Sequence, residues 1–509
     1  MNHLCNSQIG RLLTMSLGLL GLVVPTLGQS QVAVAPSEDG HHEGTWLQWP
    51  HRFTYGLLYQ QDLDPTWVSM TSALVQSEDV HIIAYSAQEE SRIRGLLNQA
   101  GVPLANVNFL IHKTDDCWVR DNGPIFVYGA DGQLKISDWG FNGWGFDTPY
   151  QKDDPVPVSV AASLGVPRVD KSVVVLEGGA IEMDGSGVLM ATRSSILEPN
   201  RNPGWTQAQM EVELAETLGI YKFIWLDGQA GGQLDITDTH IDGFARFSRK
   251  TIVTMSGPDL SYWGLSNADI QTLQGATDLT GEPYAFVELP LTVNNVVTTY
   301  GQNQNFKGSY VNFYTANTVV LVPTYADPND SIAMGILQQH YPGRTVIGID
   351  VRNLYASGGM VHCVTQQQPE RLDCQGQCVN AFCVSTSNSS GVAAQIDAVG
   401  EFGISDENFT LVASGVIPNS FGLFFYGANE GQTPFGAGWL CLSGSVARLN
   451  PALVGSASGV VAHSVDFQNG SAGVGPNQIT AGSTWKFQYW YRDGIGWNLT
   501  DGLSVTFSN

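Results

Sequence analysis

The sequence is poor in positive charge. Of its 509 residues, 23 are Lys or Arg and 47 are Asp or Glu, which gives a net charge of −24. An acidic surface disfavours nucleic acid and anionic membranes as partners and attracts cationic ligands. We therefore expect no nucleic acid and no membrane among the partners of the mature protein. The acidic residues form no continuous run, so their simplest role is solubility.

Long apolar runs are also lacking, except near the N-terminus. There Arg11 precedes an apolar run over residues 12–24, and small residues follow up to Gly28. This pattern is typical of a secretory signal peptide, and the run is short for a membrane-spanning helix. We predict a signal peptide over residues 1–28 and a protein that is secreted, periplasmic or at the cell surface. A retained membrane anchor is the alternative.

Cysteine is scarce, with seven residues in the chain. Cys5 lies in the predicted signal peptide, and Cys117 and Cys363 stand apart from the rest. The other four are Cys374, Cys378, Cys383 and Cys441. They favour disulfides in an oxidising compartment. Their spacing is not that of a familiar zinc site, so we expect no metal.

The chain is long enough for two or three domains. We expect a flexible leader over residues 29–42, an α/β domain over 43–370, a Cys-rich linker over 371–388 and an all-β, sandwich-like domain over 389–509. The last domain shows short apolar runs between Gly, Asn and Pro turns. We expect it to bind a surface or a partner, with an inert stabilising appendage as the alternative.

A helix-then-strand pattern recurs within the α/β domain. Helical periodicity over residues 86–99, 207–218 and 331–340 is followed by apolar strands over 107–111, 223–226 and 345–349, respectively. Repetition of such units indicates an α/β architecture with internal quasi-symmetry. Periodicity alone leaves open whether the units form an open sheet or a ring.

A candidate nucleophile follows a glycine pair. Gly358 and Gly359 come shortly before Cys363, which has His362 beside it. Glycines allow backbone angles that other residues avoid and so can present a thiol at the bottom of a site. A buried structural cysteine is the alternative, because free Cys is among the most buried residue types.

Charged groups that are costly to bury occur at three further places. Asp121 lies in a cluster with Trp118 and Arg120, where a structural ion pair is the simpler interpretation. Glu177 ends an apolar strand that we expect to be buried, and strand ends are where sites collect in α/β folds. His240 and Asp242 are two residues apart, so on a strand they would share a face.

Nine stretches in a fixed order resemble the agmatine deiminase and bacterial peptidylarginine deiminase family of the guanidino-group-modifying superfamily. They cover roughly residues 40–370 and are 45–52, 116–124, 138–145, 176–187, 200–203, 237–243, 309–317, 323–330 and 357–369. The resemblance implies a five-bladed α/β propeller around a central pocket. It implies no metal and no organic cofactor.

The resemblance also implies roles for individual residues. Cys363 matches the nucleophile and His240 the general acid and base, while Asp121 and Asp242 match the carboxylates that clamp a guanidinium. Trp118, Asn312, Glu177 and Asn142 are the expected substrate-binding residues. Because neighbours on a strand face opposite ways, we do not expect His362 to be the general base.

Two glycines bear on the choice of substrate. The peptidylarginine type is expected to carry two arginines just after the position of Asn142, whereas Gly143 and Gly145 stand there. The sequence therefore predicts hydrolysis of agmatine to N-carbamoylputrescine and ammonia through a covalent Cys363 intermediate. A secreted peptidylarginine deiminase is the alternative, and a non-catalytic binding scaffold is the alternative of another class. A Cys–His protease would not need the paired carboxylates.

Overall fold

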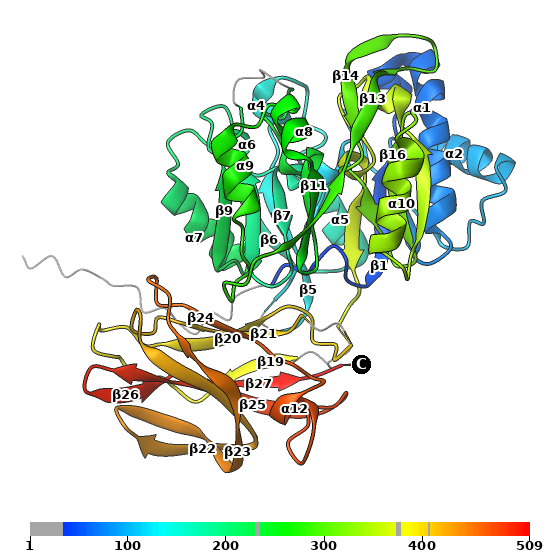
Figure 1. Cartoon of the computed structure of the whole chain (residues 1–509). Coiled ribbons are helices and arrows are strands. Elements are labelled where there is room, and N and C mark those ends of the chain that lie inside the picture. Colours follow the sequence, from blue (N-terminus) through cyan, green and yellow to red (C-terminus); the bar gives the residue numbers. More distant parts are fainter. Residues whose placement is uncertain (1–33, 130, 230–234, 373–377, 406–407, 509) are drawn as a thin grey trace, which may run out of the picture. The chain divides into compact units, whose positions relative to one another are not determined.

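The computed structural model describes residues 34–129, 131–229, 235–372, 378–405 and 408–508. Their architecture is mixed α/β with many small sheets (Figure 1). The predicted signal peptide lies outside the described residues.

Five small sheets share one pairing pattern, an antiparallel pair extended by a parallel strand. Their strand orders are β18(Gln366–Pro369)–β1(His42–Gln48)–β2(Asp79–Ala84)–β3(Val107–Ile111), β4(Ile125–Tyr128)–β5(Leu134–Gly140)–β6(Arg168–Val175), β7(Ile181–Met183)–β8(Val188–Thr192)–β9(Lys222–Leu226), β10(Ala245–Ser248)–β11(Thr251–Met255)–β12(Ala285–Leu289) and β15(Tyr314–Thr315)–β16(Val319–Thr324)–β17(Thr345–Asp350). A separate hairpin joins β13(Leu291–Val297) to β14(Asn303–Ser309). The first sheet pairs strands from opposite ends of this region, since β18 lies against β1.

Helices connect or flank these strands. The longer ones are α1(Arg52–Leu74), α2(Ala87–Gln99), α5(Val156–Leu164), α7(Gln207–Leu218), α8(Gly257–Tyr262), α9(Asn267–Gln274) and α10(Asp330–His340); the short ones are α3(Val119–Asn122), α4(Gly143–Phe146), α6(Arg193–Ile196) and α11(Arg352–Tyr355). The predicted helix over 207–218 is confirmed. Thr206 begins it with a capping box, and Gly219 ends it in the left-handed conformation that glycine permits.

Two local expectations are wrong. The strand before Glu177 is not buried throughout, because the Val173 side chain is 86% exposed. His240 and Asp242 do not share a strand face, because the short 3-10 helix Ile241–Gly243 follows His240 directly. Both side chains nevertheless reach the same cavity.

The described part of the expected flexible leader makes defined contacts. Val34 forms a backbone bridge with Tyr128, and β1 already begins at His42. Between them, the Glu38 carboxylate forms an ion pair with Arg246 at 2.7 Å. An unpaired buried carboxylate is costly, so this pairing holds the segment in place.

The C-terminal region contains two sheets, and most of its buried apolar side chains form one cluster. The larger has the order β19(Val379–Phe382)–β27(Gly502–Thr506)–β25(Thr484–Asp493)–β22(Phe421–Phe435)–β23(Gly438–Val454), with β26(Gly496–Leu499) against β25; the smaller is β20(Gln395–Val399)–β21(Thr410–Ser414)–β24(Val461–Ser464). The short helix α12(Gly470–Gly473) lies between β24 and β25 in sequence. Cys383 is joined to Cys441 by a disulfide, and Cys378 is also disulfide-bonded. Cys374 lies outside the described residues.

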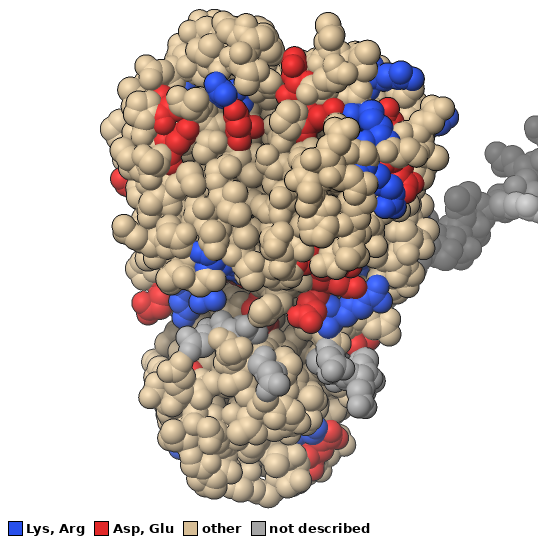
Figure 2. All heavy atoms as spheres, turned by 90° about the vertical axis from the view of Figure 1, so that its right-hand side faces the viewer, with Lys and Arg blue, Asp and Glu red and all other residues tan. Residues whose placement is uncertain are grey.

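Charged side chains of both signs are interspersed on the face shown in Figure 2. Ion pairs also form between partly exposed side chains, as between Arg352 and Asp350 at 2.7 Å. No helix among the described residues is both long and apolar enough to cross a membrane.

Candidate active site

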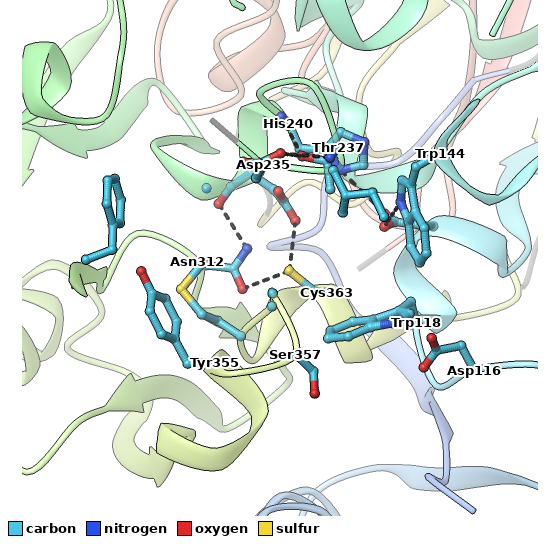
Figure 3. A pocket seen from close by; sticks show the side chains of 18 of the residues that line it. Asp116, Trp118, Trp144, Asp235, Thr237, His240, Asn312, Tyr355, Ser357 and Cys363 are labelled. Carbon is cyan, nitrogen blue, oxygen red and sulfur yellow. Dashed lines mark hydrogen bonds and ion pairs between the residues drawn. The ribbon is translucent and has the colours of Figure 1, made fainter. Parts of the chain in front are cut away.

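A cavity of about 290 Å³ brings together most of the predicted site residues (Figure 3). Its lining includes Cys363, His240, Asn312 and Trp118. It also includes four acidic residues, which are Asp116, Asp121, Asp235 and Asp242. Among the described residues that line it there is no Lys or Arg. A cavity with this lining attracts a cation, and apart from His240 its described lining residues offer a carboxylate no basic side chain.

Cys363 reaches the cavity from a short 3-10 helix, His362–Val364. Its Sγ atom lies 3.5 Å from Oδ1 of Asn312 and 3.9 Å from Oδ2 of Asp242. Burial, together with the negative charges of Asp242 and Asp121, raises the pKa of Cys363 well above its ordinary value. Burial and the two carboxylates thus favour the neutral thiol, whereas positive charge close to the sulfur would favour the thiolate.

His240 is held from behind by Glu177. The imidazole Nε2 lies 2.9 Å from Oε2 of Glu177, and Nδ1 lies 3.7 Å from Oδ1 of Asp121. Burial alone would lower the pKa of His240, but Asp121 and Glu177 raise it to about 9. The imidazole is therefore protonated at neutral pH, which is the state that a general acid requires.

Asp121 is presented by α3 and fixed by two donors. The backbone N–H of Gly179 donates to its Oδ1 at 3.1 Å, and Nε1 of Trp144 donates to its Oδ2 at 3.0 Å. Burial raises the pKa of Asp121 to about 6, against the opposing charge of His240. Above that pH the carboxylate is ionised and oriented for a cation.

Gly179 marks the point where these groups converge. A Cβ atom at this position would lie 2.7 Å from Nδ1 of His240, 2.8 Å from Oδ1 of Asp121 and 3.1 Å from Oδ2 of Asp242. No side chain fits there without displacing one of the three. The strand end that the sequence singled out at Glu177 thus supplies a glycine whose missing side chain shapes the site.

His362 supports Asp242 from outside the cavity. Its Nδ1 lies 2.8 Å from Oδ2 of Asp242, and its Nε2 lies 2.8 Å from Oε2 of Glu38. Burial would raise the pKa of Asp242, but the hydrogen bond and charge of His362 lower it below its ordinary value. Asp242 therefore stays ionised. Sequence reasoning missed the support of Asp242 by His362, because His362 is held in turn by Glu38, which lies far away in the chain.

Two predicted substrate-binding residues do not line the cavity. Glu177 pairs with His240 and also with Arg201, whose Nε lies 3.0 Å from Glu177 Oε1. Asn142 accepts the Gly145 N–H at 2.9 Å and donates to the Asn200 carbonyl at 2.8 Å. The first positions a catalytic candidate and the second fixes a turn, so neither contacts the cavity directly in this structure.

Trp118 forms a wall of the cavity, as expected. Gly359 lies so close to it that a Cβ atom would come within 2.2 Å of the indole ring. This contact explains the second glycine of the pair before Cys363. Among the described residues, no group of three or more His, Cys, Asp or Glu side chains is arranged to hold a metal ion.

Known proteins share this region of the chain. An agmatine deiminase of Pseudomonas fluorescens is 32% identical over 357 residues, which are 66% of this chain and 95% of that protein. An agmatine deiminase of Ectopseudomonas mendocina is also 32% identical, with the same coverage.

Solved structures show the same relationship. An agmatine deiminase of Enterococcus faecalis matches with a TM-score of 0.60 and 27% identity over 68% of this chain and 99% of that one. A C. jejuni agmatine deiminase with a Cys-to-Ser substitution and substrate bound matches with a TM-score of 0.58 and 25% identity, over 68% and 98% of the chains. Residues 34–369 match the family model described as Porphyromonas-type peptidyl-arginine deiminase, and the chain belongs to that family.

Proposed function

We propose that the protein is a guanidine deiminase that hydrolyses agmatine to N-carbamoylputrescine and ammonia. The observation that carries this proposal is a cavity lined by four aspartates and, among its described lining residues, by no Lys or Arg. Agmatine is a dication, with a guanidinium at one end and an amine at the other. Free arginine would bring a carboxylate that finds no Lys or Arg among the described lining residues, and the His240 imidazole already lies against Glu177 and Asp121.

The guanidinium binds between Asp121 and Asp242, whose carboxylates accept its N–H groups and offset its charge. The bound guanidinium lowers the pKa of the Cys363 thiol, because its positive charge offsets the two aspartates whose negative charges raise that pKa. The thiol proton passes to solvent, and the thiolate attacks the central guanidinium carbon and forms a C–S bond. Asn312 lies beside the sulfur and steadies it.

His240 moves the protons of both half-reactions. It donates one to the departing nitrogen, so that ammonia leaves and a thiouronium remains on Cys363. The imidazole, now neutral, takes a proton from water, and the hydroxide adds to the same carbon. Breakage of the C–S bond releases the ureido product, and the proton of the added hydroxyl returns to the sulfur and restores the Cys363 thiol. Glu177 keeps the ring oriented throughout.

We also propose that the five similar sheets are the blades of a five-bladed α/β propeller around this cavity. The repeated pairing pattern and the closure of β18 onto β1 support that arrangement. Export, with removal of residues 1–28, is a further proposal, supported by the Cys383–Cys441 disulfide because disulfides persist in oxidising compartments. N-terminal sequencing of the protein from its native host tests the cleavage.

Ammonia release tests the activity, with agmatine, free arginine and an arginine-containing peptide compared side by side. We expect turnover of agmatine, and none by Cys363→Ser. Cys117→Ser is the matched control, because Cys117 is the other free cysteine described and lies buried beside Tyr55, outside the cavity lining. Preferred turnover of the peptide would mean that the substrate is peptidylarginine and not agmatine, which is the alternative that the family description favours. Folded protein without any turnover would leave a binding scaffold.

A further inference from the structure

The larger sheet of the C-terminal region has an unusual outer face. Its inner face contributes Phe424, Tyr426 and Tyr489 to the core. The alternate residues on the same strands point the other way, and in a sandwich they are ordinarily polar. Here they are Leu423 and Phe425 on β22 and Trp490 on β25, all of which line a second cavity of about 650 Å³.

The strand register explains how this cavity is built. Leu423 lies opposite Trp490, and Trp490 lies opposite Leu499, so these three form one row across β22, β25 and β26. Leu440, Val446, Phe435 and Trp497 complete the apolar lining. Phe435 remains 44% and Trp497 37% exposed. We call this surface the outer-face groove.

Among the described residues that line the outer-face groove, two arginines are the only charged ones. Arg492 lies opposite Trp497 and stacks over Trp490, with its guanidinium carbon 5.5 Å from the ring centre. Arg448 lies opposite Phe425 on β23. Both are exposed, and no described carboxylate forms an ion pair with either.

The outer-face groove carries positive charge, whereas the C-terminal region around it is acidic. Residues 389–509 contain three Lys or Arg and eight Asp or Glu, and two of the three cations line the groove. Four residues separate the levels of Arg492 and Arg448 along the strands, or roughly 13 Å at the usual rise. Anionic groups would therefore bind at two separated points with apolar contacts between them.

We propose that the outer-face groove binds an acidic peptide segment, with one or two large apolar side chains seated on the Trp490–Leu423 floor and carboxylates paired with Arg448 and Arg492. Buried aromatic and aliphatic anchors next to charged pairs are the usual basis of peptide recognition. A glycan fits less well, because the polar groups of the described lining side chains are the two guanidiniums and two indole N–H groups, none of which accepts a hydrogen bond from a sugar hydroxyl. A fatty acid has one carboxylate for two arginines.

The test uses the full chain without its predicted signal peptide and a fluorescein-labelled peptide with two central leucines flanked by aspartates. We expect saturable binding by fluorescence anisotropy that weakens with salt. Arg448→Gln with Arg492→Gln should weaken it at least tenfold, and Trp497→Ala should weaken it similarly. Lys486→Gln is the matched control, since Lys486 is the third cation but pairs with Glu430 outside the groove. It should change affinity less than twofold.

Two further probes separate the alternatives. A peptide with lysines in place of aspartates should not bind. Vesicles of phosphatidylglycerol should bind no more tightly to wild type than to the double arginine variant. Equal peptide affinity of wild type and the double variant, or arginine-dependent binding of vesicles without binding of the peptide, would overturn the proposal. Agmatine turnover should be the same in all these variants, because none of these residues lines the active-site cavity.

Discussion

The imidazole of His362 and the carboxylate of Asp242 form a buried pair, with Nδ1 and Oδ2 2.8 Å apart. The same carboxylate oxygen lies 3.9 Å from the sulfur of Cys363. One aspartate oxygen therefore faces the Cys363 sulfur on one side and the buried His362 imidazole on the other. His362 fixes both the position and the ionisation of the group that receives the substrate.

Replacement of His362 tests this role. His362→Ala leaves Asp242 without the partner that lowers its pKa, so that pKa should rise. Because ionised Asp242 is needed to bind the guanidinium, the variant should lose activity at a higher pH than the wild type does on acidification. We expect KM for agmatine to rise at least tenfold near pH 6 and less near pH 8. His362→Asn, which retains a donor near the Nδ1 position, should recover part of the loss; an unchanged pH profile in His362→Ala would contradict the assignment.

The pH dependence of the wild type follows from two other groups. The free enzyme requires ionised Asp121, whose pKa is raised to about 6, and protonated His240, whose pKa is raised to about 9. A plot of kcat/KM against pH for agmatine should therefore rise through about pH 6 and fall through about pH 9. Activity that stays constant from pH 5 to pH 7 would exclude Asp121 as the group behind the acid limb.

Gly179 should not tolerate a side chain. Gly179→Ala places a methyl group among His240, Asp121 and Asp242, and displacement of reacting groups by about 1 Å can cost roughly 100-fold in rate. We expect a loss of that order in kcat/KM, measured by ammonia release. Gly335→Ala is the control, since nothing lies within 4 Å of its added methyl group in α10. It should leave activity unchanged; equal activity of both variants would place the reaction elsewhere.

The Cys383–Cys441 disulfide should stabilise the C-terminal region without affecting catalysis. It joins residues separated by 58 positions, and the chain-entropy relation gives about 4 kcal/mol for a loop of that length. Replacing both cysteines by Ser should lower the melting temperature of one calorimetric transition. Agmatine turnover at 25 °C should stay the same, and a parallel loss of turnover would show that catalysis depends on this region.

The sequence predicts the residues that line the cavity better than the residues that support them. Cys363, His240, Asp121 and Asp242 line one cavity, as the family motifs imply. Strand periodicity nevertheless misplaces His240, because 3-10 turns carry the residues after it and around Cys363. The rule that neighbours on a strand face opposite ways also misses the role of His362, because its partner Glu38 lies in the segment expected to be a flexible leader. Periodicity reports local structure, whereas a buried ion pair between residues 324 positions apart is visible only after folding.

The pairing of β1 with β18 determines when the first sheet can form during synthesis of the chain. His42 pairs with Pro369, so the first strand of the deiminase region has no antiparallel partner until its last strand has been made. Cys363 comes only shortly before that strand. Such long-range contacts form late, because a long loop must close before they contribute. A nascent chain would therefore be inactive until the whole deiminase region has been translated. If the chain is exported unfolded, it would cross the membrane before its active site has formed.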